Sequence, residues 1–382
     1  MTVPTFPGDE LFDEDENAFR LEFREWLARH PAPARPRSVD RAWIDTYSAW
    51  HQSLAEAGYG ALHWPPEYGG AGRPIGHQLA QIEELAKTGT DAKVLMAGLY
   101  LIAPVLMSIG TPEQKEHLPE ILMGRERWAL LLSEPGAGSD LFSLRTKGVV
   151  DGDTIRLSGQ KIWTSYGHVA DYSMALVRTD PEGKRSRGLS LVIVDMTAPG
   201  ITIRPIRQMN GAAEFNEVFL DDVPARRGDV VGALHQGASS LFLLLSAERT
   251  GLGLAGYASL VQKVEQLRAE VARSDDPHLR RRWTAMWTKV AAQRLNALRG
   301  AANLSKPDSS FAPASLAKLQ NATNAQALAE LALHARGPEA LTLDADEDVV
   351  SVFLRSPADS IGGGTSEVQK NAIAEKILEL PR

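Results

Sequence analysis

Residues 130–165 hold the part of the chain whose residue types could bind a cofactor. An apolar run leads into the turn 133–140, which offers hydroxyls and exposed backbone N–H groups between flexible glycines. A strand-like run further on ends in Trp163, Thr164 and Ser165. A loop of small residues with free donors, beside an aromatic ring and hydroxyls, suits a flat, anionic, hydrogen-bonding cofactor. An ordinary β-hairpin with a serine-rich turn would have the same composition.

Glu248 is a second candidate for chemistry, because its neighbours place it on an apolar face. One helical face carries Leu241, Leu244, Leu245, Glu248 and Leu252. Desolvation among leucines disfavours the charged carboxylate and makes it a better base near neutral pH. The same glutamate could instead pair with an arginine from elsewhere in the chain and serve only the structure.

Length and composition describe an ordinary globular protein. The 382 residues suffice for two or three domains, and 43% hydrophobic and 23% charged residues are typical of folded chains. A net charge of −7 without a basic stripe argues against nucleic acid as a partner. The absence of cysteine excludes a disulfide scaffold and a thiol nucleophile, and the nine histidines show no metal-ligand spacing, so we expect no metal site.

The sequence predicts neither a membrane span nor a targeting segment. Residues 9–16 are mostly acidic, the opposite of a signal or transit peptide. The uncharged run 94–110 is at the short limit for a span and contains Gly98 and Pro104, so we predict a buried helix there. These features favour a cytoplasmic protein.

Apolar spacing predicts an α+β chain of three domains. The first, 1–125, is predicted to be all-helical, with helices at 13–30, 43–57, 75–87, 91–109 and 111–123. The second, 126–235, is predicted to form a small barrel or sandwich, with strands at 154–157, 172–178, 189–195, 201–206 and 217–220. The third, 236–382, returns to helix, with interruptions near 274–277, 305–313 and 337–338.

Four segments together indicate a family. They are SEPGAGSD (133–140), GQKIWTS (159–165), DYSMALVRTD (171–180) and IGGGTSEVQKNAIAEKILELPR (361–382). The chain resembles the acyl-CoA dehydrogenase family over nearly its whole length, and especially actinobacterial members with a C-terminal GGGTSE motif. The resemblance implies FAD as cofactor and three domains: N-terminal all-α, middle β-barrel or sandwich, and a C-terminal four-helix bundle.

The reaction of this family desaturates an acyl thioester. A carboxylate removes a proton from the α-carbon, and flavin N5 takes the β-hydrogen as hydride. The resemblance places the usual catalytic glutamate at Gly363, which has no side chain. Other members carry the base on the earlier helix before an arginine, which implies Glu248 as base and Arg249 as the cation that positions helix and pocket. The backbone N–H of Gly363 would still hold the thioester oxygen.

The resemblance also implies a set of cofactor-binding residues. Leu131 and Ser133 would lie near the ring edge of the FAD, and Gly138 and Ser139 would lie at its pyrophosphate. Trp163, Thr164 and Ser165 would sit against the isoalloxazine. Thr365 and Glu367 would reach the phosphate and ribose region.

Two motifs of the family are missing. The Arg-x-x-Phe-Gly and Gln-Ile-Phe-Gly-Gly-type segments, which contact the FAD of a neighbouring subunit, have no counterpart in 271–286 or 332–341. An arginine within 280–282 could substitute. The chain in this respect resembles one half of the mixed α2β2 acyl-CoA dehydrogenases, so we expect a heterotetramer with a second such chain, or a homo-oligomer with rearranged FAD contacts.

Gly362 and Gly363 stand where relatives have bulkier residues, so we expect a pocket open to branched or polycyclic acyl groups, as in steroid-side-chain dehydrogenases with similar triple glycines. Electrons would pass to electron-transfer flavoprotein. The acyl group could be carried by CoA or by an acyl-carrier protein.

Alternatively, the chain could be a non-catalytic subunit that completes another chain's flavin site, or a flavin monooxygenase or oxidase. The G-x-G-x-x-G match at 251–256 lies inside helical sequence and is better explained by helix packing.

Overall fold

A computed structural model describes residues 9–34, 39–90, 93–304, 312–341 and 349–381, together with Phe6 and Pro36. Within these ranges, the side chains of residues 246–255, 303–304, 312–313 and 339 lie outside the description. Among the helices of the described ranges, none combines the length and apolarity needed to cross a bilayer.

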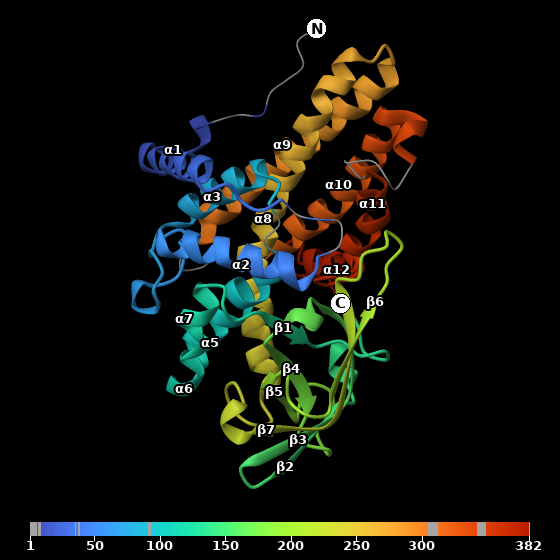
Figure 1. Cartoon of the computed structure of the whole chain (residues 1–382). Helices are drawn as coiled ribbons and strands as arrows, with labels where there is room; N and C mark the ends of the chain where they lie inside the picture. Colours follow the sequence, from blue (N-terminus) through green and yellow to red (C-terminus); the bar gives the residue numbers. More distant parts are fainter. Residues whose placement is uncertain are drawn as a thin grey trace.

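The chain runs from helices through a β-sheet and back to helices, which confirms the predicted fold. The first helical region contains α1 (Glu14–Arg29), α2 (Arg41–Glu56), α3 (Ile75–Lys87), α4 (Lys93–Met96), α5 (Ala103–Ile109), α6 (Pro112–Lys115) and α7 (His117–Leu122). The strands are β1 (Trp128–Leu131), β2 (Lys147–Asp151), β3 (Thr154–Ser165), β4 (Tyr172–Arg178), β5 (Leu189–Asp195), β6 (Ile201–Ile206) and β7 (Phe215–Arg226). The second helical region contains α8 (Gly237–Arg273), α9 (Pro277–Leu304), α10 (Ala312–Arg336), α11 (Val349–Arg355) and α12 (Ser366–Lys376). In Figure 1 the helical regions pack together, and the sheet lies below them.

Short polar sequences set where the N-terminal helices begin and end. Asp13 caps α1, because its carboxylate accepts the N–H of Glu16, whose own side chain accepts the N–H of Asp13. Thr111 caps α6 in the same way. The single helix predicted over 111–123 is instead two helices, because Pro119 has no N–H to offer the carbonyl four residues before it.

The buried helix predicted over 94–110 is present, but it contains a π-helical turn at Ala97–Ile102. Pro104 explains the wider turn, because its ring lacks an N–H and crowds the preceding turn. The indole of Trp64 donates to the carbonyl of Leu99 at 3.1 Å. This bond satisfies a backbone oxygen that Pro104 would otherwise leave without a partner.

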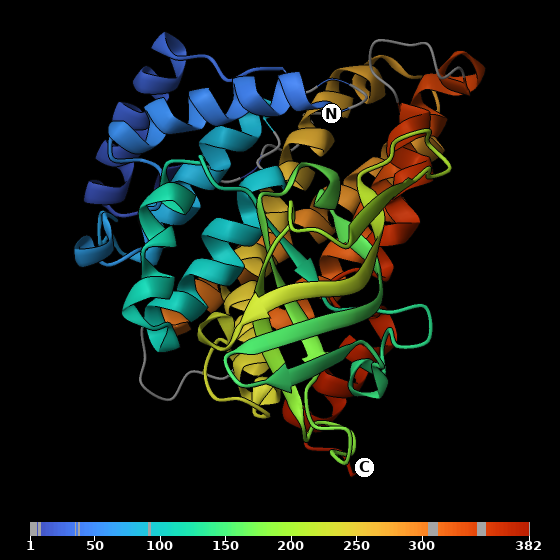
Figure 2. The same ribbon diagram turned by 60° about the horizontal axis from the view of Figure 1, so that its bottom comes forward.

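The strands form one curled sheet, which comes forward in the view of Figure 2. The order of neighbours is β1-β4-β2-β3-β7-β6, and β5 also pairs with β4. Three predicted strands coincide with β4, β5 and β6. β3 and β7 have 12 residues each and exceed the predicted 154–157 and 217–220. Polar residues in both strands break the alternation in the sequence, although the backbone pairing between the strands continues.

The long helix α8 connects the sheet to both helical regions. It contacts β5, α5, α3, α9 and α10. Leu241 and Leu244, near its start, are buried in the core that includes the N-terminal helices. Val264 and Leu267, near its end, are buried in a separate core with Trp283 of α9. The position of α8 therefore depends on all three parts of the chain.

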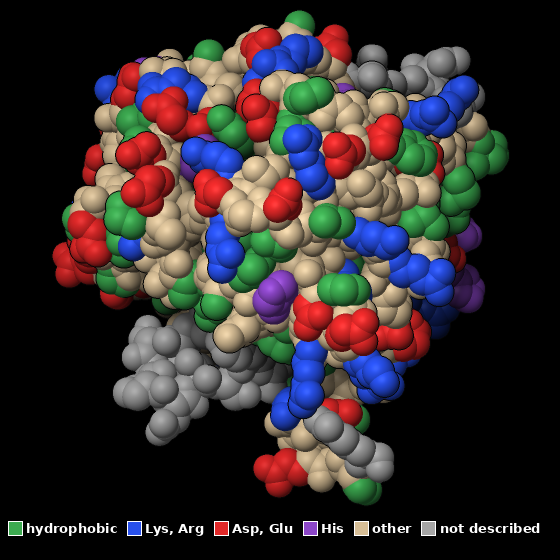
Figure 3. Space-filling view, turned by 90° about the horizontal axis from the view of Figure 1, so that it is seen from below, with side chains coloured by type: hydrophobic (Ala, Val, Ile, Leu, Met, Phe, Trp, Pro, Cys, Tyr) green, Lys and Arg blue, Asp and Glu red, His purple; other side chains and the backbone are tan. Residues whose placement is uncertain are grey.

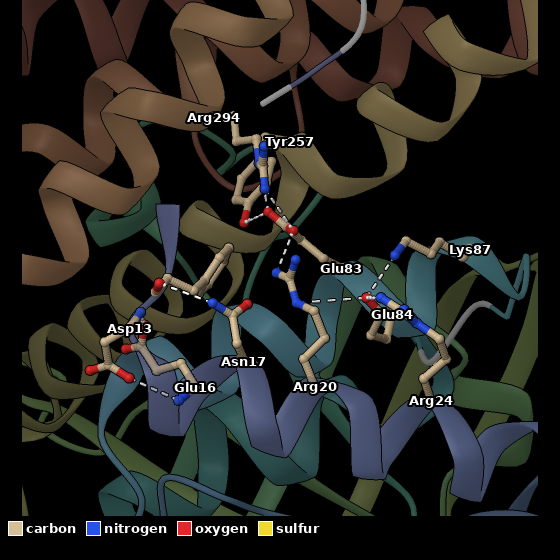
Figure 4. Close-up of polar contacts among 11 residues, drawn as sticks. Asp13, Glu16, Asn17, Arg20, Arg24, Glu83, Glu84, Lys87, Tyr257 and Arg294 are labelled. Atoms are coloured by element: carbon tan, nitrogen blue, oxygen red, sulfur yellow. Dashed lines mark hydrogen bonds and ion pairs between the residues drawn. The ribbon is translucent and has the colours of Figure 1, made fainter. Parts of the chain in front are cut away.

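A buried carboxylate, Glu83 on α3, joins the two helical regions (Figure 4). Arg20 of α1 donates to this carboxylate at 2.7 Å, Arg294 of α9 donates to both oxygens at 2.7 and 2.9 Å, and the Tyr257 hydroxyl of α8 donates at 2.9 Å. All four residues are more than nine-tenths buried. Burial raises the pKa of Tyr257 well above its usual range, and Glu83 adds to the shift, so the hydroxyl remains a donor.

The next residue, Glu84, ties α3 to α1 a second time. Its carboxylate accepts hydrogen bonds from Arg24 at 3.0 and 3.1 Å and from Lys87 at 2.6 Å. Burial alone raises the pKa of Glu84, but the hydrogen bonds from Arg24 and Lys87 outweigh it and hold the pKa below its usual value. Adjacent carboxylates on one helix thus serve two interfaces.

Replacing Glu83 should weaken the packing of the two helical regions. Glu83→Gln leaves Arg20 and Arg294 buried without their anion, so we expect the free energy of unfolding to fall by about 3–5 kcal/mol. Tyr257→Phe removes one hydrogen bond and should cost about 1 kcal/mol. Guanidinium chloride unfolding, followed by circular dichroism, measures both. Glu67→Gln, on an exposed turn, is the control and should change the value by less than about 0.5 kcal/mol. Equal midpoints for Glu83→Gln and the control would contradict the prediction.

Candidate active site

One carboxylate closes the turn 133–146. Glu134 accepts the backbone N–H groups of Arg145 at 2.7 Å and Thr146 at 2.8 Å, and it also accepts the Thr146 hydroxyl. The two ends of the turn are therefore held side by side, and the residues between them project as a loop. Burial alone raises the pKa of Glu134, but the charge of Lys161 and the hydrogen bonds to the carboxylate outweigh it, so the pKa lies below its usual value.

Lys161 holds Glu134 from inside the sheet. Its side chain is fully buried, and its Nζ donates to the Glu134 carboxylate at 3.0 Å and to the carbonyls of Leu132 at 3.0 Å and Leu176 at 2.7 Å. Burial lowers the pKa of Lys161 to about 8, and Glu134 opposes the shift. The ammonium group of Lys161 on β3 thus contacts the residue after β1, strand β4 and the turn 133–146.

Trp163 presents an exposed indole at the end of β3. Its backbone φ is 64°, in the left-handed region that is rare for bulky residues, and it lies at a register shift between β3 and β7. The bulge leaves Trp163 57% exposed, with the ring of Phe215 packed edge-on at 6.2 Å between centroids. Backbone strain at an exposed aromatic residue is typical of a ligand-binding surface.

The other predicted residues of this region lie on the adjacent ends of β1 and β3. The carbonyl of Ser133 accepts the N–H of Ile162 at 2.9 Å, so the two ends are neighbours. Leu131 and Thr164 are buried, whereas Ser165 is exposed. The hydroxyl of Thr164 is buried and, within the described part of the chain, has no hydrogen-bond partner.

The residues gathered at this loop fit a flavin nucleotide. Trp163 offers a flat exposed surface, and Thr164 offers a buried hydroxyl that no described residue uses. Gly138 and Ser139 lie at the exposed tip of the loop, and a Cβ placed at Gly138 would meet no atom within 4 Å. The backbone there is therefore open to close approach by a phosphate group.

Thr365 and Glu367 lie at the start of α12. The Thr365 hydroxyl caps the helix by accepting the N–H of Val368, and Glu367 is exposed in the first turn. As far as the structure describes the chain, no hydrogen bond or ion pair joins either residue to β1 or β3. Their role at a cofactor stays a prediction.

Arg355, at the end of α11, connects the C-terminal helices to the sheet. Its guanidinium donates to the Glu214 carboxylate at 2.6 Å and lies 5.2 Å from the centroid of the Phe215 ring. Phe215 also contacts Trp163, and the carbonyl of Glu214 accepts the N–H of Tyr166 just beyond β3. The C-terminal segment is thereby fixed beside the exposed indole. Sequence reasoning missed Arg355, because its partner is 141 residues away.

Glu248 and Gly363, the two positions considered for a catalytic base, lie on different elements. Gly363 precedes α12 with a φ of 67°, a conformation that suits glycine and strains a residue with a side chain. Glu248 and Arg249 lie within α8, but their side chains are outside the described residues. On the predicted apolar face of α8, Leu241 and Leu244 are buried.

Sequence reasoning also missed Lys161. A signal was present in β3. Ile155, Leu157 and Lys161 are all buried in this strand, so the lysine occupies a core position. A buried ammonium requires a buried acceptor, and Glu134 is that acceptor.

The sequence matches the family models of three acyl-CoA dehydrogenase domains. The N-terminal domain matches residues 13–125, the middle domain residues 129–223 and the C-terminal domain residues 241–378. Acyl-CoA dehydrogenase IpdE1 of Mycobacterium tuberculosis is 37% identical over 388 residues, which cover 97% of this chain and 99% of that protein. Acyl-CoA dehydrogenase FadE26 of the same organism is 31% identical, with 97% and 98% covered.

Solved structures show the same architecture. The ChsE4-ChsE5 complex from Mycobacterium tuberculosis contains a chain that is 29% identical, with a TM-score of 0.84 and complete coverage of both chains. The Tcur3481-Tcur3483 steroid ACAD contains a chain that is 26% identical, with a TM-score of 0.87 and coverage of 97% of this chain and 99% of that one.

Removing the cation of the Lys161–Glu134 pair should destabilise the sheet. Lys161→Met leaves Glu134 buried without its partner, so we expect the free energy of unfolding to fall by about 3–5 kcal/mol. Lys161→Met/Glu134→Gln should recover much of this loss. Arg125→Met, which breaks an exposed pair with Glu120, should cost less than about 1 kcal/mol. Chemical unfolding followed by tryptophan fluorescence provides the values, and additive losses in the double variant would rule out coupling.

Proposed function

This chain belongs to the acyl-CoA dehydrogenase family, and we propose that it uses Glu248 and FAD to introduce an α,β double bond into an acyl thioester. The carboxylate of Glu248 takes the α-proton, and the electron pair of that C–H bond becomes the new π bond. FAD, when bound, accepts the β-hydrogen as hydride. The observation that carries the proposal is a full-length family match in a chain whose closing motif has a left-handed glycine at 363.

The choice of Glu248 follows from the surroundings of α8. Leu241 and Leu244 are buried on the face that includes position 248, so a carboxylate there would be poorly solvated. A desolvated carboxylate is a stronger base, which the weakly acidic α-carbon requires. Arg249, the next residue, would supply a positive charge near this helical turn. The alternative position, Gly363, has no side chain with which to accept a proton.

Gly363 would contribute its backbone N–H to the thioester oxygen. This N–H belongs to the backbone and not to a side chain, so a glycine at this position still offers it. The carbonyl of Gly363 accepts the side-chain amide of Gln369 at 3.2 Å, and Thr365 caps α12 two residues later. These contacts fix the backbone of the motif, which is what a preorganised donor needs.

The loop 133–146 and the end of β3 would bind the FAD. Leu131 and Ser133 would lie near the ring edge, and Gly138 and Ser139 would lie at the pyrophosphate. Trp163, Thr164 and Ser165 would sit against the isoalloxazine. The clamp of Lys161 on Glu134 supports this role, because it holds the loop at a defined distance from β3.

A bulky acyl group is the substrate class that the closing motif favours. A Cβ added at Gly362 would have only the carbonyl oxygen of Ala358 nearby, at 3.6 Å, so the space beside this residue is open. One structural relative is described as a steroid ACAD, which supports a polycyclic substrate for this chain. CoA is the proposed carrier, since the relatives are named as acyl-CoA enzymes.

The partners proposed are a second acyl-CoA dehydrogenase chain and electron-transfer flavoprotein as electron acceptor. The missing cross-subunit motifs, together with a relative described as a ChsE4-ChsE5 complex, favour a mixed assembly over a homo-oligomer. In such an assembly the partner chain would complete the flavin site.

Flavin content and bleaching test the proposed chemistry. We expect purified chain alone to hold well under one FAD per chain by absorbance, and co-expression with a dehydrogenase-like partner to restore it. In the flavin-loaded protein, Glu248→Gln should abolish bleaching by substrate while FAD remains bound. Glu265→Gln, farther along α8, is the matched control and should bleach normally. Normal bleaching by Glu248→Gln would disprove the assignment of the base, and one FAD per chain without a partner would disprove the mixed assembly.

Gly362→Phe tests the substrate class. The position has no left-handed φ and has free space beside it, so the fold should tolerate the ring. We expect kcat/KM for the CoA thioester of a steroid acid to fall about tenfold or more, because the ring narrows the pocket, with little change for butyryl-CoA. Gly228→Phe, also in open space, without a left-handed φ and outside the proposed site, is the control for thermal stability. Preference for butyryl-CoA in the unmodified protein would contradict a bulky substrate.

A further inference from the structure

We propose that Gln78, Tyr100 and His63 form a polar site that binds an uncharged oxygen, preferably that of a ring ketone, at the far end of the acyl group. Gln78 comes from α3, Tyr100 from the π-helical turn Ala97–Ile102, and His63 from the loop between α2 and α3. The inference rests on the proposed function, because it specifies the chemistry of the acyl group in the same substrate.

The three side chains lie together. The imidazole of His63 stacks on the ring of Tyr100, with 5.2 Å between the ring centroids and 11° between the ring planes. Burial raises the pKa of Tyr100, and the neighbouring amide of Gln78 opposes the shift. The amide is therefore beside the phenol hydroxyl, although its nitrogen forms no hydrogen bond of normal geometry there.

The amide nitrogen of Gln78 is a buried donor without an acceptor. The residue is 3% exposed, and its Nε2 has no hydrogen-bond partner within the described part of the chain. His63 likewise forms no hydrogen bond or ion pair with a described residue, and both His63 and Tyr100 are partly exposed. Few buried polar groups in folded proteins lack a partner, and the oxygen of a bound ligand would supply the one that Gln78 lacks.

The site carries no charge, which restricts the ligand. Burial lowers the pKa of His63 to about 4, so the imidazole is neutral near pH 7. By contrast, the molecular surface in Figure 3 carries charged side chains of both signs. The carboxylates of Glu83 and Glu84, further along α3, are bound by arginines. An amide N–H, a neutral imidazole and a phenol hydroxyl suit a ketone or hydroxyl oxygen rather than a carboxylate.

The π-helical turn places Tyr100 beside the turn of α8 that carries position 248. Ile109 of α5 is a neighbour of Ser240, since a Cβ added at Gly232 would lie 3.4 Å from the first side chain and 2.7 Å from the second. Ser240 is near the start of α8, and both α5 and the π-helical turn contact α8, so the paired segments run in opposite directions. Tyr100 precedes Ile109 by nine residues and is therefore level with a point roughly nine residues beyond Ser240.

A contact of α3 leads to the same part of α8. Tyr257 of α8 donates to Glu83 at 2.9 Å, and Gln78 lies five residues before Glu83 on α3. Because Gln78 is beside Tyr100, this end of α3 extends toward the start of α8, about 8 Å from the level of Tyr257. Position 248 and the polar site are thus separated by about one helical turn and one interhelical distance, on the order of 10 Å.

This separation sets the size of the acyl group. A distance of about 10 Å corresponds to roughly three residues of extended chain, or about nine bonds. A short straight acyl group ends before that distance, whereas a polycyclic group reaches it with a ring oxygen. π-Helical turns inside α-helices are frequent at functional sites, and this one carries Tyr100.

Matched CoA thioesters of one polycyclic acid test the proposal on the flavin-loaded protein. One thioester has a ring ketone about 10 Å from the α-carbon, and the other has a methylene group in its place. We expect kcat/KM, measured with a dye as electron acceptor, to be at least about tenfold higher for the ketone, because the methylene compound leaves the Gln78 donor unpaired.

Gln78→Leu removes the donor and keeps a side chain of similar size. We expect it to abolish the preference for the ketone through a loss of about tenfold or more in kcat/KM for that thioester, with little change for the methylene compound. Tyr100→Phe keeps the ring beside His63 and should also reduce the preference. It provides a second variant should Gln78→Leu fold poorly.

Gln293→Leu is the matched control. Gln293 is 2% exposed, and its amide group is bonded to Asn321 at 3.3 Å and Asn324 at 2.7 Å. We expect this variant to lose thermal stability but to keep the preference for the ketone. Gln78→Leu should lose less stability than the control, because the amide nitrogen that it removes has no partner.

Binding without turnover separates this proposal from the proposed reaction. Equal kcat/KM for the two thioesters in the unmodified protein, or an unchanged preference in Gln78→Leu, would overturn the polar site and leave the dehydrogenase chemistry standing. Calorimetry with flavin-loaded Glu248→Gln measures the affinity for each thioester in the absence of the proposed base. Tighter binding of the ketone there by about tenfold would support the polar site even if the unmodified protein bleached with neither thioester, an outcome that would refute only the reaction.

Discussion

The arrangement of the helices depends on the desolvated carboxylate of Glu83. Its two oxygens are shared by Arg20, Arg294 and Tyr257, which come from three other helices, and none of these groups has access to water in which to find another partner. Glu84 lies 3.7 Å from Arg20 and balances the remaining positive charge. A buried charge of this kind penalises every arrangement that separates the partners, so it selects one relative position of α1, α3, α8 and α9. Because α8 also carries position 248, the packing of the helices determines where the proposed base stands.

In the middle domain, too, an ion pair in the protein interior fixes the position of neighbouring segments. Lys161 is a cation inside a sheet, and its contacts with Glu134 and two carbonyls stabilise its charge there. Glu134 in turn holds the two ends of the loop that carries Gly138 and Ser139. The exposed parts of the proposed flavin site are thus supported by a fully buried lysine and its largely buried carboxylate partner. Function is placed on a loop, and its geometry comes from the core beneath it.

The proposed site divides its tasks among elements from the middle and C-terminal parts of the chain. The end of β3 offers a flat indole, α8 carries the proposed base, and the segment before α12 offers a backbone donor. Arg355 of α11 contacts Glu214 and Phe215, and Phe215 contacts Trp163, so the C-terminal helices are linked to the end of β3. Gly362 leaves open space beside it, and Gly363 would contribute its backbone N–H. Such a division allows the substrate pocket to change without disturbing the reacting groups.

The sequence by itself determined the order of helical, β and helical regions, because apolar periodicity and capping residues such as Thr111 act over a few residues. It also predicted the loop 133–140 and Trp163 as features of one site, through local residue types and a resemblance. The full lengths of β3 and β7 and the π-helical turn at Pro104 required the structure, since partner strands and Trp64 supply the missing hydrogen bonds. Tertiary structure alone decided the pairs Glu83–Arg294, Glu134–Lys161 and Glu214–Arg355. Their partners are 211, 27 and 141 residues apart. A charge is stabilised by whichever opposite charge the fold buries beside it, and no local pattern in the sequence specifies that neighbour.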